Sequence, residues 1–215
     1  MTDTFTLASA DDVADLTTFA QRAERLGCAL MRLTVVGSHL AVTVCVLEKQ
    51  GLLDSHPYVF GLRVFELSRD EGDLANNSEL DVLIETRALL DRLARMNVTV
   101  DVPVAQARVP WAGVAAPRDG WVHGGSVGAA ELIAVAKSGI DEVASANGLG
   151  TNIVTEVRRT VWTRRVGESG IFAGMAFAAF GLGFAREGTD DQISVTTNGS
   201  WTRITTARGY VLARM

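Results

Sequence analysis

Histidine is scarce in this sequence, since only His39, His56 and His123 occur among its 215 residues. Protein metal sites need several ligands at characteristic spacings, and the chain contains no H-x-x-x-H, C-x-x-C or H-E-x-x-H pattern. The Walker and G-x-G-x-x-G patterns are also missing. Asp54, Ser55 and His56 are the residue types of a hydrolytic triad, but neighbours in one turn cannot align as nucleophile, base and orienter. We therefore predict no metal, no cofactor and no catalytic residue.

Cysteine is almost as rare, with only Cys28 and Cys45, both in segments that we predict to be strands. Two cysteines in a chain of this length do not make a disulfide framework. A disulfide between neighbouring strands is one alternative. The other, which we favour, is a pair of buried free thiols, because free cysteine behaves as a small core residue.

An excess of positive charge and a long apolar run are both missing. The net charge is −5, so the strongly cationic surface of a typical nucleic-acid binder is not expected. The most apolar stretch, residues 169–185, is shorter than the roughly 20 residues that cross a bilayer, and Glu168 and Arg186 flank it. The N-terminus lacks a basic region followed by an apolar run, so we expect a cytoplasmic protein without a membrane span.

The N-terminal half has the patterns of an antiparallel sheet with covering helices. Apolar residues at spacings of three and four predict helices over residues 10–26, which Gly27 ends, and 86–96. Ser9 and Asp12 stand at the positions of a capping box. Strands are predicted from their alternation at residues 3–7, 29–36, 40–47, 58–67 and 80–84, with a tight turn at Gly37-Ser38.

Proline separates this half from the rest. Pro103, Pro110 and Pro117 fall in residues 98–122, which show no helical period and should form an extended connector. Trp111 and Trp121 should pin this connector to the core.

The C-terminal half is predicted to be helical before it ends in a β-hairpin. Helices are expected from Ser126, as a cap, to about Ala146, and over residues 151–165. Residues 169–185 are apolar on every side, which predicts a helix in the centre of the core. Short strands at residues 193–197, 201–206 and 210–213 are punctuated by Asn198-Gly199, a strong hairpin signal.

The segment most typical of a binding site is W-V-H-G-G-S-V-G-A-A-E, from Trp121 to Glu131. Here Gly124, Gly125 and Ser126 would lead into a helix N-terminus, whose N–H groups and dipole favour an anion. His123 would add a contact that depends on protonation. We take these four residues as candidate ligand-binding residues of a small-molecule enzyme or of a protein that binds an anion or a phosphate ligand. The alternative is a glycine loop without a ligand.

Two other functions compete with that one. Helices over residues 126–165, a third helix and a final hairpin resemble a winged helix-turn-helix, with Arg158, Arg159, Arg164 and Arg165 as the basic side chains. The apolar third helix cannot enter a DNA groove, however, so a nucleic-acid partner is not favoured. Small residues in that helix, such as Gly174 and Ala178, could instead pack against a second copy of the chain.

Several short motifs carry a family resemblance that extends over most of the chain. They are L-L-D-R-L-A-R at 89–95, V-P-W-A-G-V at 109–114, P-R-D-G-W at 117–121, and G-S-W-T-R-I at 199–204 ahead of G-Y-V-L-A-R. With these motifs the chain resembles a family of uncharacterised proteins from high-GC Gram-positive bacteria. The resemblance implies no activity and no functional residue.

The sequence thus predicts an α+β protein with an N-terminal antiparallel sheet and covering helices, and a C-terminal helical part that ends in a β-hairpin. The predicted divisions are residues 1–97, the connector 98–122 and residues 123–215, with one domain throughout as the alternative. The leading functional hypothesis is a non-enzymatic binding or assembly protein that forms homodimers or binds a protein partner. Whether the chain is an enzyme stays open.

Overall fold

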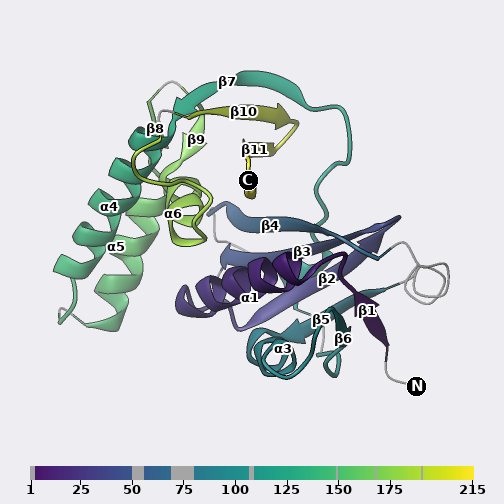
Figure 1. Cartoon of the computed structure of the whole chain (residues 1–215). Coiled ribbons are helices and arrows are strands. Elements are labelled where there is room, and N and C mark those ends of the chain that lie inside the picture. Colours follow the sequence, from purple (N-terminus) through teal and green to yellow (C-terminus); the bar gives the residue numbers. More distant parts are fainter. Residues whose placement is uncertain are drawn as a thin grey trace. The chain divides into compact units, whose positions relative to one another are not determined.

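Helices and strands are mixed along the whole chain in the computed structural model, which confirms the predicted α+β class (Figure 1). The structure describes residues 3–49, 56–68, 80–106, 109–148, 150–167, 169–189 and 191–215. The chain forms two structural units. Unit 1 comprises Met1–Val46 and Leu62–Val114, and unit 2 comprises Leu47–Gly61 and Ala115–Met215.

Unit 1 has an antiparallel sheet in the order β5-β2-β3-β4, with a separate pair of strands, β1 and β6. Its elements are β1 (Thr4–Thr6), α1 (Ala10–Arg25), β2 (Leu30–Val36), β3 (His39–Leu47), β4 (Tyr58–Glu66), β5 (Asp81–Glu85), α3 (Thr86–Leu93), β6 (Thr99–Asp101) and the 3₁₀ turn η1 (Pro110–Gly113). Tyr58–Gly61 of β4 belong to unit 2. The predicted hairpin is confirmed, because β2 pairs antiparallel with β3 across Gly37-Ser38.

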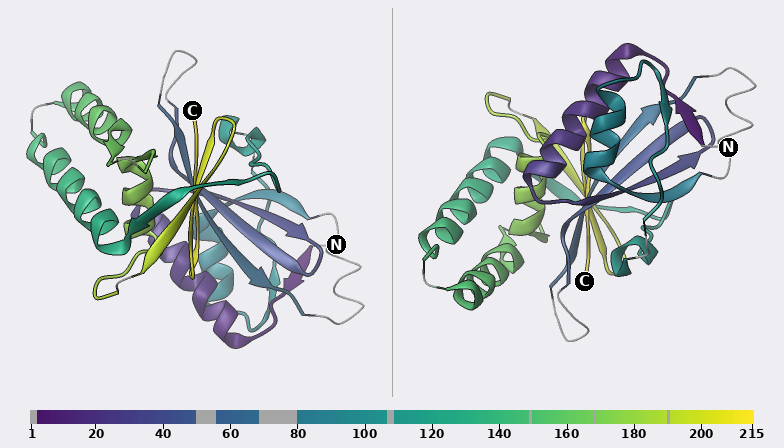
Figure 2. Two further views of the ribbon diagram at one scale, coloured as in Figure 1. Left: turned by 90° about the horizontal axis from the view of Figure 1, so that it is seen from above. Right: turned by 90° about the horizontal axis from the view of Figure 1, so that it is seen from below.

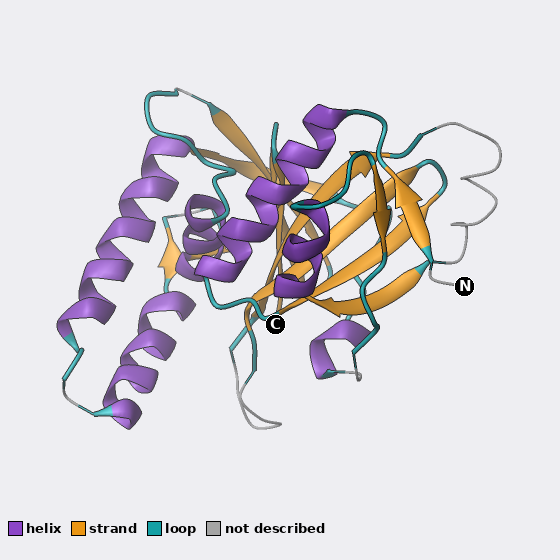
Figure 3. Ribbon diagram, turned by 60° about the horizontal axis from the view of Figure 1, so that its bottom comes forward, coloured by secondary structure: helices purple, strands orange, loops and turns teal. Residues whose placement is uncertain are grey.

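The core of unit 1 lies between this sheet and the two helices. Alternate residues of β2 are buried, namely Met31, Leu33 and Val35. They are the residues that the alternation predicted to share one face. The helices α1 and α3 contact each other and lie side by side (Figures 2 and 3). Their buried side chains are Leu16, Phe19, Ala20 and Ala23 of α1 and Leu89, Leu90 and Leu93 of α3.

Local chemistry sets the ends of α1 as predicted. The Ser9 hydroxyl accepts a hydrogen bond from the Asp12 N–H at 3.2 Å and donates one to the Asp12 carboxylate at 2.6 Å. A side-chain cap of this kind satisfies a backbone donor that the helix leaves open. At the other end the N–H groups of Gly27 and Cys28 bond to Glu24 and Ala23. That is the Schellman pattern.

The predicted connector is less extended than expected. Its residues Thr99–Asp101 form β6, which pairs with β1, and Pro110–Gly113 form η1. Trp111 is 4% exposed, so it anchors this part of the chain in unit 1 as predicted. Trp121 belongs to unit 2, where its indole N–H donates to the carbonyl of Pro117 at 3.0 Å.

Unit 2 has an antiparallel sheet in the order β12-β11-β10-β7 and three helices. Its elements are β7 (Val122–Gly128), α4 (Ala129–Ser145), α5 (Thr151–Thr163), β8 (Arg165–Val166), β9 (Ile171–Phe172), α6 (Ala173–Gly181), β10 (Gln192–Asn198), β11 (Trp201–Thr206) and β12 (Gly209–Arg214). The predicted terminal hairpin is confirmed by β10 and β11, and it belongs to a larger sheet through β7 and β12.

The apolar segment forms the centre of unit 2, although its helix is shorter than predicted. The helix α6 is packed against α4, α5 and β12, and α4 and α5 lie side by side (Figures 1 and 2). Ile171 and Phe172 pair with β8 and are therefore not helical. At the other end Gly183 has φ +72°, and the N–H groups of Gly183 and Phe184 bond to Phe180 and Ala179. Only glycine adopts this left-handed position readily, so the helix stops there.

Candidate functional site

The four candidate ligand-binding residues lie on the edge strand β7. His123, Gly124 and Ser126 are exposed and Gly125 is half-buried. The strand β7 pairs antiparallel with β10 (Figure 1). In their register Ser126 stands opposite Ser194. The predicted glycine loop is therefore wrong, because these residues form a strand.

The predicted cap at Ser126 is also wrong. The helix α4 begins at Ala129, and its N-cap residue is Gly128, with no side-chain hydrogen bond. The Ser126 hydroxyl instead donates to the side-chain carbonyl of Gln192 at 3.3 Å. A helix dipole acts mainly on its first turn. His123 to Ser126 lie on the strand before that turn, so they do not form the anion-binding site that was predicted at the helix N-terminus.

The backbone of β7 exposes hydrogen-bonding groups along its outer side. The Ala129 N–H donates to the Asp191 carbonyl, and in the register of β7 and β10 Val127 faces Ile193 while Gly125 faces Val195. Pairs that exchange hydrogen bonds alternate along an antiparallel ladder. Residues 125, 127 and 129 therefore direct their backbone groups towards β10. Ser126 and Gly128 direct theirs away from it, at the end of the described strand order.

A bulge limits this edge on one side. The register between β7 and β10 shifts between Val195 and Thr196, which leaves Gly124 as the extra residue of β7. Gly125 has φ +125°, a conformation that L side chains rarely adopt. Bulges increase the local twist and interrupt the ladder. Within the described part of the chain, the regular part of the edge that no second strand covers is thus Gly125–Gly128.

The edge of unit 1 at β5 is built differently. Because Thr86 N–H bonds to Ala29 and Val35 N–H bonds to the Leu80 carbonyl, alternation directs the backbone groups of Asp81, Leu83 and Glu85 outward. The Leu83 carbonyl accepts a hydrogen bond from the Gln106 N–H at 2.7 Å. Two carboxylates and a covering segment are common protections against strand addition. Residues 122–128 contain no Lys, Arg, Asp, Glu or Pro, so β7 lacks those protections.

Residues 124–128 read G-G-S-V-G and fit the G-x-S-x-G pattern of a hydrolase nucleophile, a match that was not predicted. That nucleophile sits on a strained turn between a strand and a helix, with a histidine within hydrogen-bonding distance. Ser126 instead lies within a strand ladder, and no described non-glycine residue has a positive φ. Ser126 forms no hydrogen bond with a histidine in the described chain. The geometry does not support acyl transfer.

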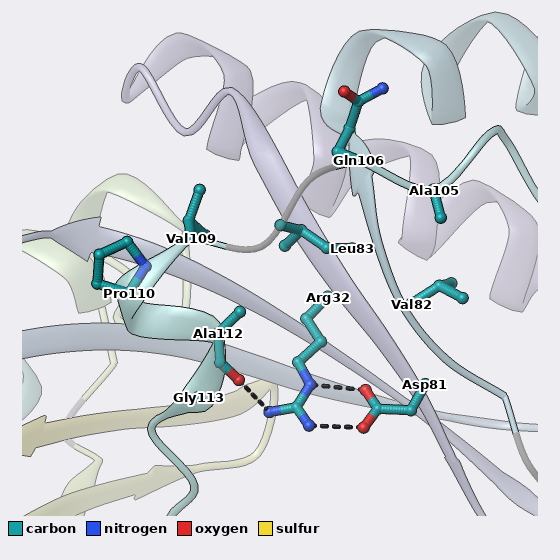
Figure 4. Close-up of a pocket in the computed structure, with 10 residues that line it drawn as sticks. All are labelled: Arg32, Asp81, Val82, Leu83, Ala105, Gln106, Val109, Pro110, Ala112 and Gly113. Carbon is teal, nitrogen blue, oxygen red and sulfur yellow. Dashed lines mark hydrogen bonds and ion pairs between the residues drawn. The ribbon is translucent and has the colours of Figure 1, made fainter.

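A cavity of about 470 Å³ in unit 1 is a second candidate (Figure 4). Arg32 and Asp81 lie at one end, and the rest is lined by Gln106 and by apolar residues such as Val82, Leu83 and Val109. Arg32 donates two hydrogen bonds to the Asp81 carboxylate, at 2.7 and 2.6 Å, and a third to the Ala112 carbonyl at 2.8 Å. Each of its nitrogens thus has a hydrogen-bond partner in the protein. This guanidinium therefore links β5 to the 3₁₀ turn η1 and is not available to bind a ligand.

The same ion pair determines the charge of the cavity. The hydrogen bonds from Arg32 hold the pKa of Asp81 below its usual value, and the Thr34 hydroxyl adds a further hydrogen bond at 3.2 Å. The pKa of Arg32 is raised by the same contact. Both groups stay ionised near neutral pH, so neither is suited to transfer a proton in catalysis.

No disulfide joins Cys28, which is buried, and Cys45, which is half-buried. The Cys28 thiol donates to the Cys45 carbonyl at 3.4 Å, and burial raises its pKa to about 12. A thiol with such a pKa is not a nucleophile at neutral pH.

Within the described residues no group of three or more His, Cys, Asp or Glu side chains could hold a metal ion. Asp54 and Ser55 lie outside those residues. No described helix is both long and apolar enough to cross a bilayer.

Two family models match the chain. Residues 1–113 match the model described as Domain of unknown function (DUF8010), and residues 116–215 match Domain of unknown function (DUF8185). No curated protein matches. Among solved structures the chain is similar to the beta clamp of H. pylori in complex with 5-chloroisatin, with 12% identity and a TM-score of 0.45. This likeness covers 100% of the present chain, which spans 66% of that clamp chain.

Proposed function

Because the chain belongs to the family described as Domain of unknown function (DUF8010), whose description gives no activity, we propose a function from the geometry of β7. The protein is a non-enzymatic assembly protein that self-associates, and the strand β7 of one copy pairs antiparallel with β7 of a second copy. The observation that carries this proposal is the outward-facing, uncharged backbone edge at Ser126 and Gly128.

A second copy fits this edge by symmetry. Two-fold pairing requires that the outward-facing residues of both strands meet. A register centred on Val127 places Ser126 opposite the partner's Gly128 and Gly128 opposite the partner's Ser126, within the regular part of the edge. These small side chains allow the two backbones to approach, and no like charges face each other across the ladder.

The small residues of α6 do not supply this interface. Gly174 lies against Trp162 and Leu47, and Ala178 is fully buried, so both contribute to packing within unit 2. The self-association suggested by the composition is therefore proposed at β7 instead.

The two alternative functions, a ligand-binding site at His123 to Ser126 and a winged helix-turn-helix, have less support. Among the described residues His123 and Ser126 form no hydrogen bond or ion pair with a carboxylate or an arginine, and the strands of the predicted wing are part of a larger sheet.

Sedimentation equilibrium and native mass spectrometry of the full chain test the proposal. Ser126→Pro removes an outward-facing N–H and leaves the ladder with β10 intact, because residue 126 does not donate to β10. We expect a wild-type dimer whose dissociation constant rises at least about ten-fold in this variant, a loss of about 1.4 kcal/mol. Ser126→Thr keeps the N–H and is the matched control, with the dimer retained.

Two results contradict the proposal. A wild-type chain that stays monomeric at every accessible concentration excludes self-association. A dimer that both variants form equally well shows that the interface lies elsewhere. A monomer that binds a strand-forming peptide would assign the edge to a different protein partner, and it would also count against self-association.

A further inference from the structure

Arg203 occupies an unusual position on the sheet of unit 2. Its guanidinium carbon lies 4.3 Å from the ring centre of Trp121 and 5.9 Å from that of Tyr210. Its Nε donates to the Thr196 hydroxyl at 3.2 Å. The side chain is thus held in place by an aromatic ring on the connector, a second ring on β12 and a hydroxyl on β10. The stack pins Trp121 to the sheet, which accounts for its structural role.

Stacking on the two rings does not neutralise the positive charge of Arg203. Arg32 is neutralised by Asp81, and Arg164 is neutralised by the two carboxylate oxygens of Glu142 at 2.5 and 2.6 Å. Among the described residues no carboxylate pairs with Arg203, and no protein acceptor takes its terminal N–H groups. An arginine fixed in this way presents a fork of donors that matches a carboxylate or a phosphate.

Residues with hydroxyl groups lie on the same face of the sheet as Arg203. The ladders place Thr196 opposite Arg203, and two residues along each strand they align Ser194, Thr205 and Tyr210 across three strands. Residues two apart on a strand share a face, so this row lies on the same face as Arg203. All three residues are half-buried. We call Arg203 with Ser194, Thr205 and Tyr210 the Arg203 face.

From this arrangement we infer that the Arg203 face is a binding site for a phosphate group. The two terminal nitrogens of Arg203 bind two phosphate oxygens, and the row of hydroxyls donates to the remaining oxygen. A phosphate group has a third oxygen for the hydroxyls, whereas a carboxylate has to share its two oxygens between Arg203 and the hydroxyls, so a phosphate satisfies more of these donors. Stacking on Trp121 and the bond to Thr196 fix the guanidinium before the ligand arrives, which lowers the entropy cost of binding.

Inorganic phosphate is the probe, and NMR of the ¹⁵N-labelled full chain is the measurement. We expect saturable shifts of the Arg203 Nε–H and Trp121 indole N–H signals, with no such shifts when chloride replaces phosphate at equal ionic strength. Arg203→Lys keeps the charge but loses the planar fork, and it should weaken binding at least about ten-fold. Arg165→Lys is the matched control. Arg165 also stacks on a ring, with 4.1 Å to Phe172, but lies on β8 rather than on the Arg203 face, so binding should not change.

A second variant separates binding from folding. Ser194→Ala leaves the stack of Arg203 intact and removes one hydroxyl, so we expect phosphate to bind a few-fold more weakly with an unchanged protein spectrum. The inference fails if wild-type protein gives no saturable response. It also fails if Arg203→Lys and Arg165→Lys bind phosphate equally well. Acetate that saturates the site as tightly as phosphate would overturn the assignment to a phosphate group.

Discussion

Glycine and tryptophan residues are closely packed where α4, α5 and α6 meet. A Cβ atom added to Gly139 would lie 2.4 Å from Cζ3 and 2.7 Å from Cη2 of Trp162, and one added to Gly174 would lie 2.5 Å from Leu47. Trp162 also stacks on Phe177 with ring centres 4.5 Å apart. The stacked Phe177 ring restricts movement of the indole away from Gly139. A side chain at position 139 would therefore clash with Trp162.

Gly139→Ala should consequently destabilise the protein, although alanine is the better helix former by about 0.5–1 kcal/mol. We expect the clash with Trp162 to outweigh this gain and to lower the free energy of unfolding by about 1–3 kcal/mol. Urea denaturation measures the change. Gly113→Ala is the control, because a Cβ at Gly113 meets nothing within 4 Å. A variant at 139 that is more stable than wild type would show that the indole moves.

The Arg32–Asp81 ion pair should make stability depend on pH. The folded-state pKa of Asp81 is depressed, so its contribution is present above the unfolded pKa of about 3.9 and is lost as pH falls through the lower folded value. Both side chains are partly exposed, so we expect Asp81→Asn to cost about 1 kcal/mol or less at pH 7. The cost should be smaller at pH 2 than at pH 7.

Unfolding of this variant and of wild type at both pH values measures the difference. Asp141→Asn is the control, because Asp141 is exposed and makes no ion pair within the described residues. A loss from Asp81→Asn that is equal at both pH values would mean that shape or hydrogen bonding, and not charge, is responsible.

At the scale of helices and strands, the sequence predicts those features that interactions between neighbouring residues determine. The Ser9 cap, the end of α1 at Gly27 and the Gly37-Ser38 hairpin depend on neighbouring residues, and all three are confirmed. The strand β7 was missed, because V-H-G-G-S-V-G has low β propensity and becomes a strand through its pairing with β10. Such pairing depends on register between distant segments, which composition does not reveal.

The same limit applies to the candidate sites. Alternation along residues 201–206 indicates that Trp201 and Arg203 share a face, but the stack with Trp121 depends on how distant segments meet. The four residues His123 to Ser126 were found because glycine and histidine are conspicuous in sequence. Their role was assigned to a helix N-terminus, whereas their position on an edge strand points to backbone pairing. Ligand binding and homodimer formation stay predictions.

At the scale of the whole molecule, the family models and the structural units divide the chain differently. The two models match residues 1–113 and 116–215, and they meet within the predicted connector 98–122. Unit 2, however, also contains Leu47–Gly61. Leu47 lies against Gly174 of α6, and Phe60 and Trp201 have ring centres 6.1 Å apart. A division by family model would therefore remove part of the core of unit 2.

We accordingly expect residues 116–215 alone to unfold without a cooperative transition in near-UV circular dichroism. Residues 47–61 fused to this fragment through a flexible linker should restore the transition, because they return Leu47 and Phe60 to the core. The same fusion with Phe60→Ala is the matched variant, and loss of a buried aromatic ring should lower its stability by about 3–5 kcal/mol. If residues 116–215 unfold cooperatively by themselves, the family boundary is also the folding boundary, and Leu47–Gly61 contribute contacts that the fold of unit 2 does not require.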